Sequence, residues 1–351
     1  EKEIRELAKK IDAIEQQIRE LERLIAAVRK QVIEEAAVIG ATLSMTYMST
    51  DLQAQQYDAL FIDEISMAPL LPMFFAMGLV SSSCTLIGDF LQLPPIGTQS
   101  KNELLKKWHN RSFFDIIGMN SVGKARSSEF VKPLSIQYRM NPAIAAIPNK
   151  LFYGDILQSG DNTKTRVLSD QWVQDQPLFL VDTSEGAPWM NRGPNGQSRC
   201  NLYHATLAAA MAQDYLANET QDGKEITVGV VVPYRSQKDL INDILDESLG
   251  KNSPARKRIE VNTVHSFQGG EKDVIICDSV ESEGKDAKWF FFDDGSRNNH
   301  SAPLMLNVAV TRAKSKFILL ANVKFVQQNF TGHIFKDMLD ILHQHGVTLS
   351  V

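Results

Sequence analysis

Two short apolar runs in the first third of the chain end on acidic residues. Residues 60–62 (Leu-Phe-Ile) precede Asp63 and Glu64, and residues 85–87 (Thr-Leu-Ile) precede Gly88-Asp89. Such runs are typical of buried parallel strands, and ligands of open α/β sheets bind outside the carboxyl ends of the strands. A carboxylate pair there can hold Mg²⁺ and orient a water molecule toward a phosphate. One core strand with a terminal acid is common, but two favour a phosphate-handling site.

Five later segments carry further side chains suited to phosphate chemistry. They are residues 92–95 (Gln-Leu-Pro-Pro), 137–140 (Gln-Tyr-Arg-Met), 232–237 (Val-Pro-Tyr-Arg-Ser-Gln), 263–271 (Thr-Val-His-Ser-Phe-Gln-Gly-Gly-Glu) and 307–314 (Asn-Val-Ala-Val-Thr-Arg-Ala-Lys). In order and sequence, the segment with Asp63 and Glu64 and these later segments together resemble motifs II to VI of superfamily 1 helicases. Residues 41–44 (Ala-Thr-Leu-Ser) resemble motif Ic. Ordered motifs over residues 36–325 are far more specific than a single pattern match.

The branch that the chain resembles is the senataxin-like, nonsense-mediated-decay branch, whose members translocate 5′ to 3′. Residues 63–67 (Asp-Glu-Ile-Ser-Met) are also similar to the RecD-like branch. The Gln-Tyr-Arg-Met segment and the Phe-Gln-Gly at 267–269 favour the senataxin-like one.

The resemblance implies that ATP, with Mg²⁺, is hydrolysed between two RecA-like domains. Asp63 would help to hold Mg²⁺, and Glu64 would orient or deprotonate the attacking water. Gln92 would sense the γ-phosphate. Arg139 and Arg312 would act as arginine fingers, because a planar, permanently charged guanidinium stabilises the charge of the transition state.

The remaining residues implied by the resemblance bind the nucleotide or a nucleic acid. The nucleotide residues are Tyr138 near the base, Gly269, and Glu271, which would accept from the ribose. The nucleic-acid residues are Thr42, Thr263 and His265, whose small polar tips suit phosphate contacts that position a strand without reading its sequence. The basic run 256–258 (Arg-Lys-Arg) could add charge, but a solvated loop is the favoured interpretation.

The chain departs from the family pattern in three places. Val232 stands where a threonine is usual, and Leu304 and Met305 replace arginines often found before Asn307. No Walker A sequence, Gly-x-x-x-x-Gly-Lys-Thr, lies upstream of Asp63. An upstream segment or a second chain would therefore have to supply the loop that binds the β- and γ-phosphates.

Residues 118–125 (Gly-Met-Asn-Ser-Val-Gly-Lys-Ala) match that loop pattern except at the last position. Ala125 cannot bind Mg²⁺, and the segment follows motif III. Only a short apolar run precedes it, and no helix signature follows. We therefore reject it as a phosphate-binding loop.

Apolar runs that alternate with helical stretches predict the elements that position these segments. The predicted strands are 38–40, 59–62, 85–87, 178–181, 227–232, 274–277 and 317–321, and the predicted helices are 205–216, 236–245 and 334–345. This alternation predicts an α/β fold with parallel sheets and covering helices. Residues 282–301 read as a surface loop because they are rich in Gly, Asp, Asn and Ser.

Residues 1–37 predict one long helix with a narrow coiled-coil seam. Apolar residues recur in steps of three and four from Ile4 to Val32, and Gly and Pro are absent. A seam of this length must be covered by another helix. The family resemblance implies an antiparallel stalk helix from the same protein, and without it the chain should dimerise through the seam.

We therefore expect a stalk helix at 1–37, the incomplete first RecA-like domain at 38–127, and the second RecA-like domain at 128–351.

Composition is that of an ordinary globular protein, with 43% apolar and 23% charged residues among 351. No apolar stretch is long enough to cross a bilayer, and there is no signal peptide. Cys84, Cys200 and Cys277 show no metal spacing and are interpreted as buried thiols in a reducing compartment, the cytoplasm or the nucleus. The net charge of −5 excludes a uniformly basic surface but permits a local basic groove.

Two hypotheses follow from the sequence. The first is the C-terminal portion of an ATP-dependent helicase or translocase that moves on single-stranded DNA or RNA. The second is a catalytically inactive nucleic-acid-binding scaffold that has lost its P-loop and pairs through its coiled coil. The complete set of Asp63, Glu64, Gln92, Arg139 and Arg312 favours the first.

Overall fold

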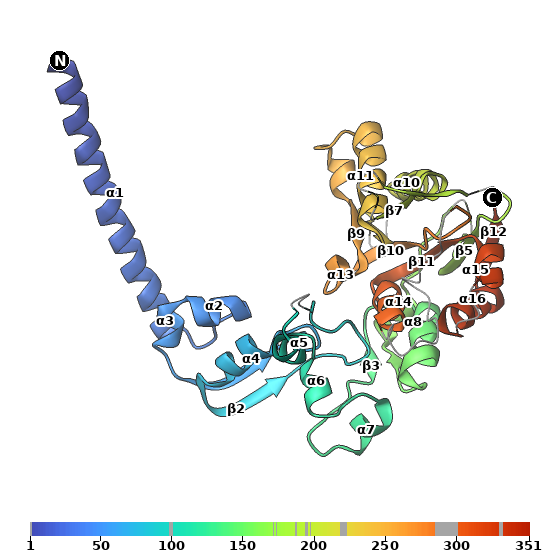
Figure 1. The fold of residues 1–351 in the computed structure, drawn as a ribbon, viewed down its shortest axis with the longest axis horizontal. Coiled ribbons are helices and arrows are strands. Elements are labelled where there is room, and N and C mark those ends of the chain that lie inside the picture. The colour runs from blue at the N-terminus through green and yellow to red at the C-terminus, as the bar shows by residue number, and fades with distance from the viewer. Residues whose placement is uncertain are drawn as a thin grey trace. The chain divides into compact units, whose positions relative to one another are not determined.

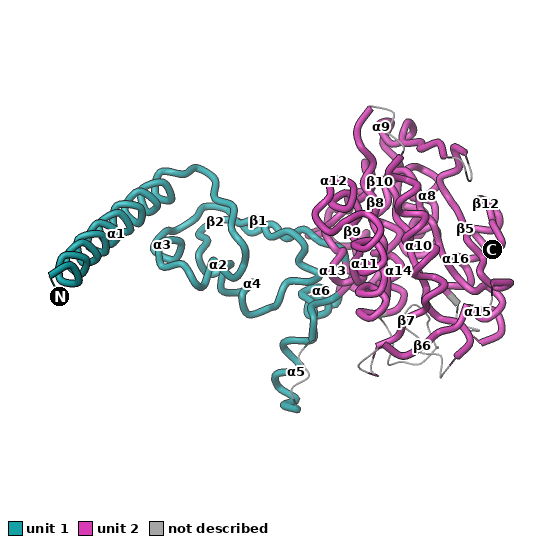
Figure 2. The backbone as a smooth tube through the Cα atoms, turned by 90° about the horizontal axis from the view of Figure 1, so that it is seen from above, with its two compact units in different colours: residues 1–89, 94–118 teal, residues 90–93, 119–351 magenta. Residues whose placement is uncertain are grey.

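The computed structural model divides the chain into two compact units (Figures 1 and 2). Unit 1 comprises residues 1–89 and 94–118, and unit 2 comprises residues 90–93 and 119–351. The structure describes residues 2–97, 101–170, 172, 174–186, 188–193, 196, 198–217, 223–284, 301–329 and 333–351.

Helix α1 (Lys2–Glu35) is continuous, as predicted, and leaves its apolar seam bare. None of its residues is buried, and the seam side chains from Ile4 to Val32 are between 48% and 70% exposed. The helix therefore gains almost no stabilisation from packing against the part of the chain that the structure describes.

The α/β part of unit 1 is built on two parallel strands, β1 (Tyr57–Ile62) and β2 (Val80–Leu86). Its helices are α2 (Leu43–Met48), α3 (Thr50–Gln53), α4 (Leu70–Met77), α5 (Glu103–His109) and α6 (Phe113–Ile116). A small core of Ile62, Ile65, Leu70 and Met73 holds β1 against α4. Only these two strands pair within the described part of unit 1.

The strand predicted at 38–40 is wrong. The structure has no strand there, and the Val38 side chain is 91% exposed. A short apolar run forms a strand only where a neighbouring strand accepts its backbone hydrogen bonds.

Unit 2 contains a six-stranded parallel sheet in the order β12-β5-β11-β10-β8-β9. The strands are β5 (Leu178–Asp182), β8 (Val228–Val232), β9 (Ile259–Thr263), β10 (Lys272–Asp278), β11 (Ala313–Ala321) and β12 (Val347–Ser350). Every strand pair in this sheet is parallel, so the predicted α/β class is confirmed.

Helices cover both faces of this sheet (Figure 1). Side chains of α8 (Pro142–Pro148), α14 (Ser301–Thr311) and α16 (His333–His345) share one buried cluster with the sheet. Side chains of α10 (Leu202–Tyr215) and α11 (Arg235–Leu249) share the other. Burial on both faces explains why the predicted strands are continuous apolar runs.

Shorter elements complete unit 2. They are α7 (Val122–Ser127), β3 (Ile136–Gln137), η1 (Asn149–Tyr153), β4 (Gln158–Ser159), α9 (Asp161–Lys164), β6 (Met190–Arg192), β7 (Arg199–Asn201), α12 (Pro254–Lys257), α13 (Val264–Phe267) and α15 (Val323–Asn329). Helix α7 begins inside the rejected segment 118–125 and ends two residues after it, so a short helix is present where the sequence showed no helix signature. Most of the predicted loop 282–301 lies outside the described residues, and α14 begins at its end.

Two expectations from composition can be compared with the structure. Cys84 is exposed and Cys200 only half-buried, so the interpretation of three buried thiols holds for Cys277 alone. Among the described residues, no helix is both long and apolar enough to span a membrane.

Candidate active site

The two acidic strand ends of unit 1 lie side by side. The Ile87 amide donates to the Ile62 carbonyl over 2.8 Å, and the Ile65 amide donates to the Ile87 carbonyl over 3.0 Å. These bonds extend the β1–β2 pairing past the ends of both strands. Asp63 and Glu64 therefore stand at the carboxyl edge of a parallel pair, which is the position expected from the sequence.

The turn after β1 is strained and tightly packed. Glu64 has a φ of +54°, which is uncommon for a residue other than glycine, and its amide donates to Asp63 Oδ1 over 2.8 Å. A Cβ atom on Gly88 would lie 2.8 Å from Ile65 Cγ1 and 3.1 Å from the Ile65 amide nitrogen. Only glycine at position 88 allows β2 to end this close to the acidic turn.

A second constellation lies at the amino-terminal edge of the unit 2 sheet. Glu271 immediately precedes β10, and Lys314 is the second residue of the neighbouring strand β11. Glu271 Oε2 accepts from Arg139 Nε and Glu271 Oε1 from Lys314 Nζ, each over 2.8 Å. Both carboxylate oxygens are thus bonded to cations, so a ribose hydroxyl would share Glu271 with them or displace one of them.

The electrostatics of this edge keep Glu271 ionised. Partial burial by itself raises the pKa of its carboxyl, but hydrogen bonds from Lys314 and Arg139, together with their charges, lower the pKa below its ordinary value.

Arg312 is buried, with 1% of its surface exposed. Its Nε donates to the Val308 carbonyl (3.1 Å) and its Nη1 to the Gly270 carbonyl (3.3 Å). Its Nη2 donates to Thr311 Oγ1 (3.0 Å) and to Gln92 Oε1 (3.4 Å). The structure therefore brings Gln92 next to Arg312 within unit 2.

Arg139 is more accessible, with 35% of its side chain exposed. Gln137 Oε1 accepts from the amides of Arg139 and Met140, over 2.9 and 2.8 Å, and so fixes the turn that presents the guanidinium. Arg139 Nη1 also donates to the Thr311 carbonyl over 3.2 Å. Gln137 thus positions Arg139, and Lys314 positions Glu271. The motif sequences had assigned no role to Gln137 or Lys314.

Two of the predicted nucleotide residues have distinctive surroundings. The ring of Tyr138 lies against Gly160, where an added Cβ would stand 2.5 Å from ring carbons, and 59% of Tyr138 remains exposed. Gly269 has a φ of +83°, a backbone conformation in which a side chain is strained. An exposed aromatic face over a glycine is suited to stacking on a base.

The predicted nucleic-acid residues do not lie at the edge of the unit 2 sheet that holds Arg139 and Glu271. Thr263 ends β9 opposite Val232, at the carboxyl edge of the unit 2 sheet, and its Oγ1 lies 3.3 Å from Ser266 Oγ. His265 follows on α13, and burial lowers the pKa of its imidazole. Thr42 lies in unit 1, where its side chain caps α2 by accepting from the Met45 amide over 3.4 Å.

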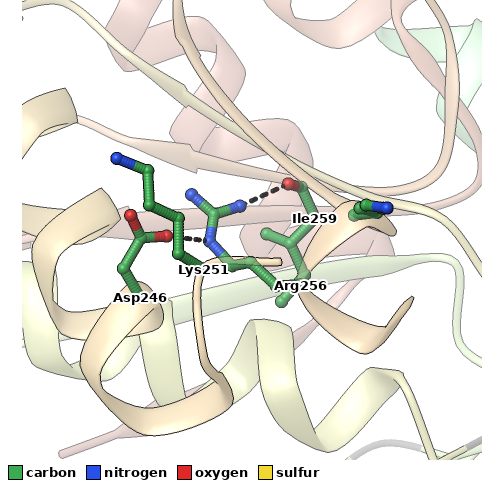
Figure 3. A pocket seen from close by; sticks show the side chains of 5 residues that line it. Asp246, Lys251, Arg256 and Ile259 are labelled. Atoms are coloured by element: carbon green, nitrogen blue, oxygen red, sulfur yellow. Dashed lines mark hydrogen bonds and ion pairs between the residues drawn. The ribbon is translucent and has the colours of Figure 1, made fainter. Parts of the chain in front are cut away.

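The basic run 256–258 has a structural role, so its interpretation as a solvated loop is wrong. Arg256 Nε donates to Asp246 Oδ1 over 2.6 Å, and Arg256 Nη1 donates to the Ile259 carbonyl over 2.8 Å (Figure 3). Arg258 Nε donates to the Ile226 carbonyl over 2.9 Å. The two Arg256 bonds join α12 to α11 and β9, and the Arg258 bond joins the end of α12 to the residues before β8.

Comparison with known families identifies the chain. Its residues 110–324 match an AAA domain family, and its residues 1–100 match a second AAA domain family. The chain belongs to the AAA-domain helicases of superfamily 1. The resemblance drawn from the motifs is therefore confirmed.

Individual relatives support the same assignment. Helicase sen1 of Schizosaccharomyces pombe is 30% identical over 87% of this chain, which covers 17% of that protein. The ATP-dependent helicase upf1 of the same organism is 26% identical over 84%, covering 31% of that protein. The uncharacterized ATP-dependent helicase MJ0104 of Methanocaldococcus jannaschii is 30% identical over 84%, covering 40% of that protein.

Among solved structures, that of the PRRSV helicase superposes with a TM-score of 0.34 and 14% identity over 78% of this chain and 37% of that one. The chain spans between 17% and 40% of the lengths of the three curated relatives.

Proposed function

We propose that this chain is part of an ATP-dependent helicase or translocase that moves 5′ to 3′ on single-stranded DNA or RNA. The observation that carries the proposal is the cluster at the amino-terminal edge of the unit 2 sheet, where Arg139 bonds to Glu271 and Arg312 bonds to Gln92. Both arginines also donate to backbone carbonyls there, Arg139 to that of Thr311 and Arg312 to that of Gly270. Guanidinium groups beside a glutamine and an ionised carboxylate suit the recognition of a nucleoside triphosphate.

In this proposal the two units contribute different groups to hydrolysis. Glu64 orients or deprotonates the attacking water, and Gln92 contacts the γ-phosphate. Arg139 and Arg312 stabilise the charge that develops on the transferred phosphoryl group. Tyr138 stacks on the base, while Gly269 and Glu271 bind the nucleotide. Thr42, Thr263 and His265 contact the phosphates of the nucleic acid.

Asp63 has the chemistry that a magnesium site requires. It is an exposed carboxylate directly after a parallel strand, and Mg²⁺ in nucleotide sites is held by one or two carboxylates together with substrate phosphates. Bound there, Mg²⁺ would neutralise phosphate charge. A Walker A segment from upstream of this chain or from a second chain would complete that site.

The proposed location is the cytoplasm or the nucleus. The three unpaired cysteines and the similarity to the helicases sen1 and upf1 support it.

The test is ATP hydrolysis by the full-length protein that contains this chain, with and without matched single-stranded DNA or RNA. We expect stimulation by single strands. We expect Glu64→Gln, which keeps the side-chain volume, to lower kcat at least a hundredfold with little change in ATP affinity, as general-base removal does. Hydrolysis that is absent from the parental protein, while nucleic-acid binding persists, would instead support the inactive scaffold.

A further inference from the structure

Residues 90–93 pack with unit 2, although the residues on either side of them, Asp89 and Pro94, pack with unit 1. Leu93 is fully buried within the core cluster that α8, α14 and β11 share. The segment that carries Gln92 is therefore anchored in unit 2 by the buried side chain of Leu93.

Asn307 supplies a polar anchor for the same segment. It is fully buried in α14, and its Nδ2 donates to the Leu91 carbonyl over 2.8 Å and to the Tyr153 hydroxyl over 2.9 Å. Its Oδ1 is buried and accepts no hydrogen bond in the described structure. Leaving a buried carbonyl oxygen unsatisfied costs about 1–3 kcal/mol. The two hydrogen bonds that the Asn307 NH2 group donates are therefore the reason for an asparagine at this position.

Hydrogen bonds around Asn307 connect Leu91 and Gln92 to the end of α14. Thr311 Oγ1 donates to the Asn307 carbonyl over 2.8 Å and accepts from Arg312 Nη2 over 3.0 Å. Arg312 Nη2 also reaches Gln92 Oε1 over 3.4 Å. Leu91 is thus held through its backbone by Asn307, and Gln92 is held through its side chain by Arg312, which follows the end of the same helix.

We propose that Asn307 is a positioning residue that holds the Leu91 carbonyl so that Gln92 stays beside Arg312. This inference rests on the proposed function, because it assigns Asn307 an effect on ATP turnover that acts through Gln92. A packing role alone would lower stability without an effect that depends on Gln92.

The test uses the full-length protein that contains this chain and the variant Asn307→Leu, which keeps the volume but removes both donors. Asn307→Asp, which places a carboxylate against the Leu91 carbonyl, is the second variant in case the first does not fold. We expect amide hydrogen exchange in residues 90–93 to become at least tenfold faster. We expect kcat for ATP to fall at least tenfold, with KM changed less than threefold.

A double-mutant cycle separates positioning from packing. If Asn307 acts through Gln92, Asn307→Leu should lower kcat no further once Gln92→Ala is present, and Gln92→Ala alone should leave exchange at 90–93 unchanged. Asn149→Leu is the matched control. It removes an asparagine that bonds to both backbone groups of Leu157, and should raise exchange near residue 157 but not at 90–93.

Unchanged exchange at 90–93 in folded Asn307 variants would overturn the proposal, whatever the ATPase rates. Additive losses in the cycle would also overturn it, because Asn307 would then act by another route. If Gln92→Ala leaves turnover intact, the role proposed for Gln92 is wrong, and with it the effect of Asn307 on turnover. The exchange result still decides whether Asn307 holds the segment.

Discussion

Arg139 and Arg312 share the proposed role of arginine finger but differ in their surroundings. Arg139 is partly exposed and bonded to Glu271, whereas Arg312 is buried and bonded to four oxygens of its own unit. Replacement by alanine should therefore slow ATP turnover at both positions but lower stability only at Arg312.

In the full-length protein, Arg139→Ala and Arg312→Ala should each lower the turnover of ATP by on the order of 10³-fold, because each removes a cation that stabilises transition-state charge. ATP binding should change little in both. Only Arg312→Ala should also lower the thermal midpoint, because it leaves buried oxygens unsatisfied. Arg192→Ala, at an exposed arginine of β6, is the control. Near-parental hydrolysis in both variants would refute the assignment.

Glu271 allows a prediction about pH. Its pKa is lowered in the folded protein, so the carboxylate contributes stability above about pH 4.5, and this contribution is lost as pH falls through the folded pKa. Lys314→Met removes one of the two cations and should raise the pKa of Glu271. The measurement is the side-chain carboxyl chemical shift of Glu271 followed by NMR across an acid titration. An unchanged midpoint would show that Lys314 does not hold this carboxylate in solution.

At the scale of elements, the sequence predicted strands whose neighbours bury both faces. The runs at 178–181, 274–277 and 317–321 appear within β5, β10 and β11, because continuous apolar runs suit a sheet covered by helices. β12 (Val347–Ser350) was missed because it is exposed at the sheet edge and mixes Thr and Ser with apolar residues.

The candidate site, too, was predicted from the sequence only in part. The motif sequences predicted Arg139, Glu271 and Arg312. In unit 2 the structure pairs Arg139 with Glu271, and Arg312 donates to the carbonyl of the neighbouring Gly270. The motif sequences gave no role to Asn307, although a lone amide within the apolar run 302–310 is a signal for a buried polar contact. The partner of Asn307 is a backbone carbonyl more than two hundred residues away, and no local pattern encodes such a contact.

Helix α1 predicts self-association of this 351-residue chain. Burying an Ile or Leu side chain contributes roughly 1.5–3 kcal/mol, and the nine seam positions together should exceed the roughly 4–15 kcal/mol cost of association. In a parallel dimer, Lys10 of one helix would face Glu15 of the other, an attractive contact between flanking positions. In the intact protein, an antiparallel stalk helix is the proposed occupant of the same seam.

Light scattering should show a dimer for this chain and a monomer for the variant with Ile11, Ile18 and Ile25 replaced by Asp. Both should show the same near-ultraviolet circular dichroism, because no α1 side chain belongs to either buried core of unit 2. In a Cys84→Ser background, Ile18→Cys should form a disulfide with its own copy in a parallel, in-register dimer. A monomeric parental chain would disprove the prediction.

At the scale of the whole molecule, the proposed hydrolysis of ATP would need a Walker A loop, and the 351 residues contain no such sequence upstream of Asp63. No Walker A lysine precedes Asp63, so nothing in this chain provides the usual neutralisation of the β- and γ-phosphates. The isolated chain should therefore not hydrolyse ATP measurably, with or without single strands. Robust stimulated hydrolysis from the purified chain would contradict this, and a Glu64→Gln sample would exclude a contaminating enzyme.

Binding of single strands should nevertheless survive in the isolated chain, because the residues proposed to contact phosphates lie within it. A protein with a net charge of −5 can bind a polyanion only through local contacts, each of which releases counterions. Affinity should therefore fall at least tenfold between about 50 and 200 mM salt and vary little with base sequence. Thr263→Val, which keeps the shape of the side chain and removes its hydroxyl, should weaken binding to all sequences alike. If the affinity did not change across the salt titration, or depended strongly on base sequence, the chain would not bind mainly through the phosphate backbone.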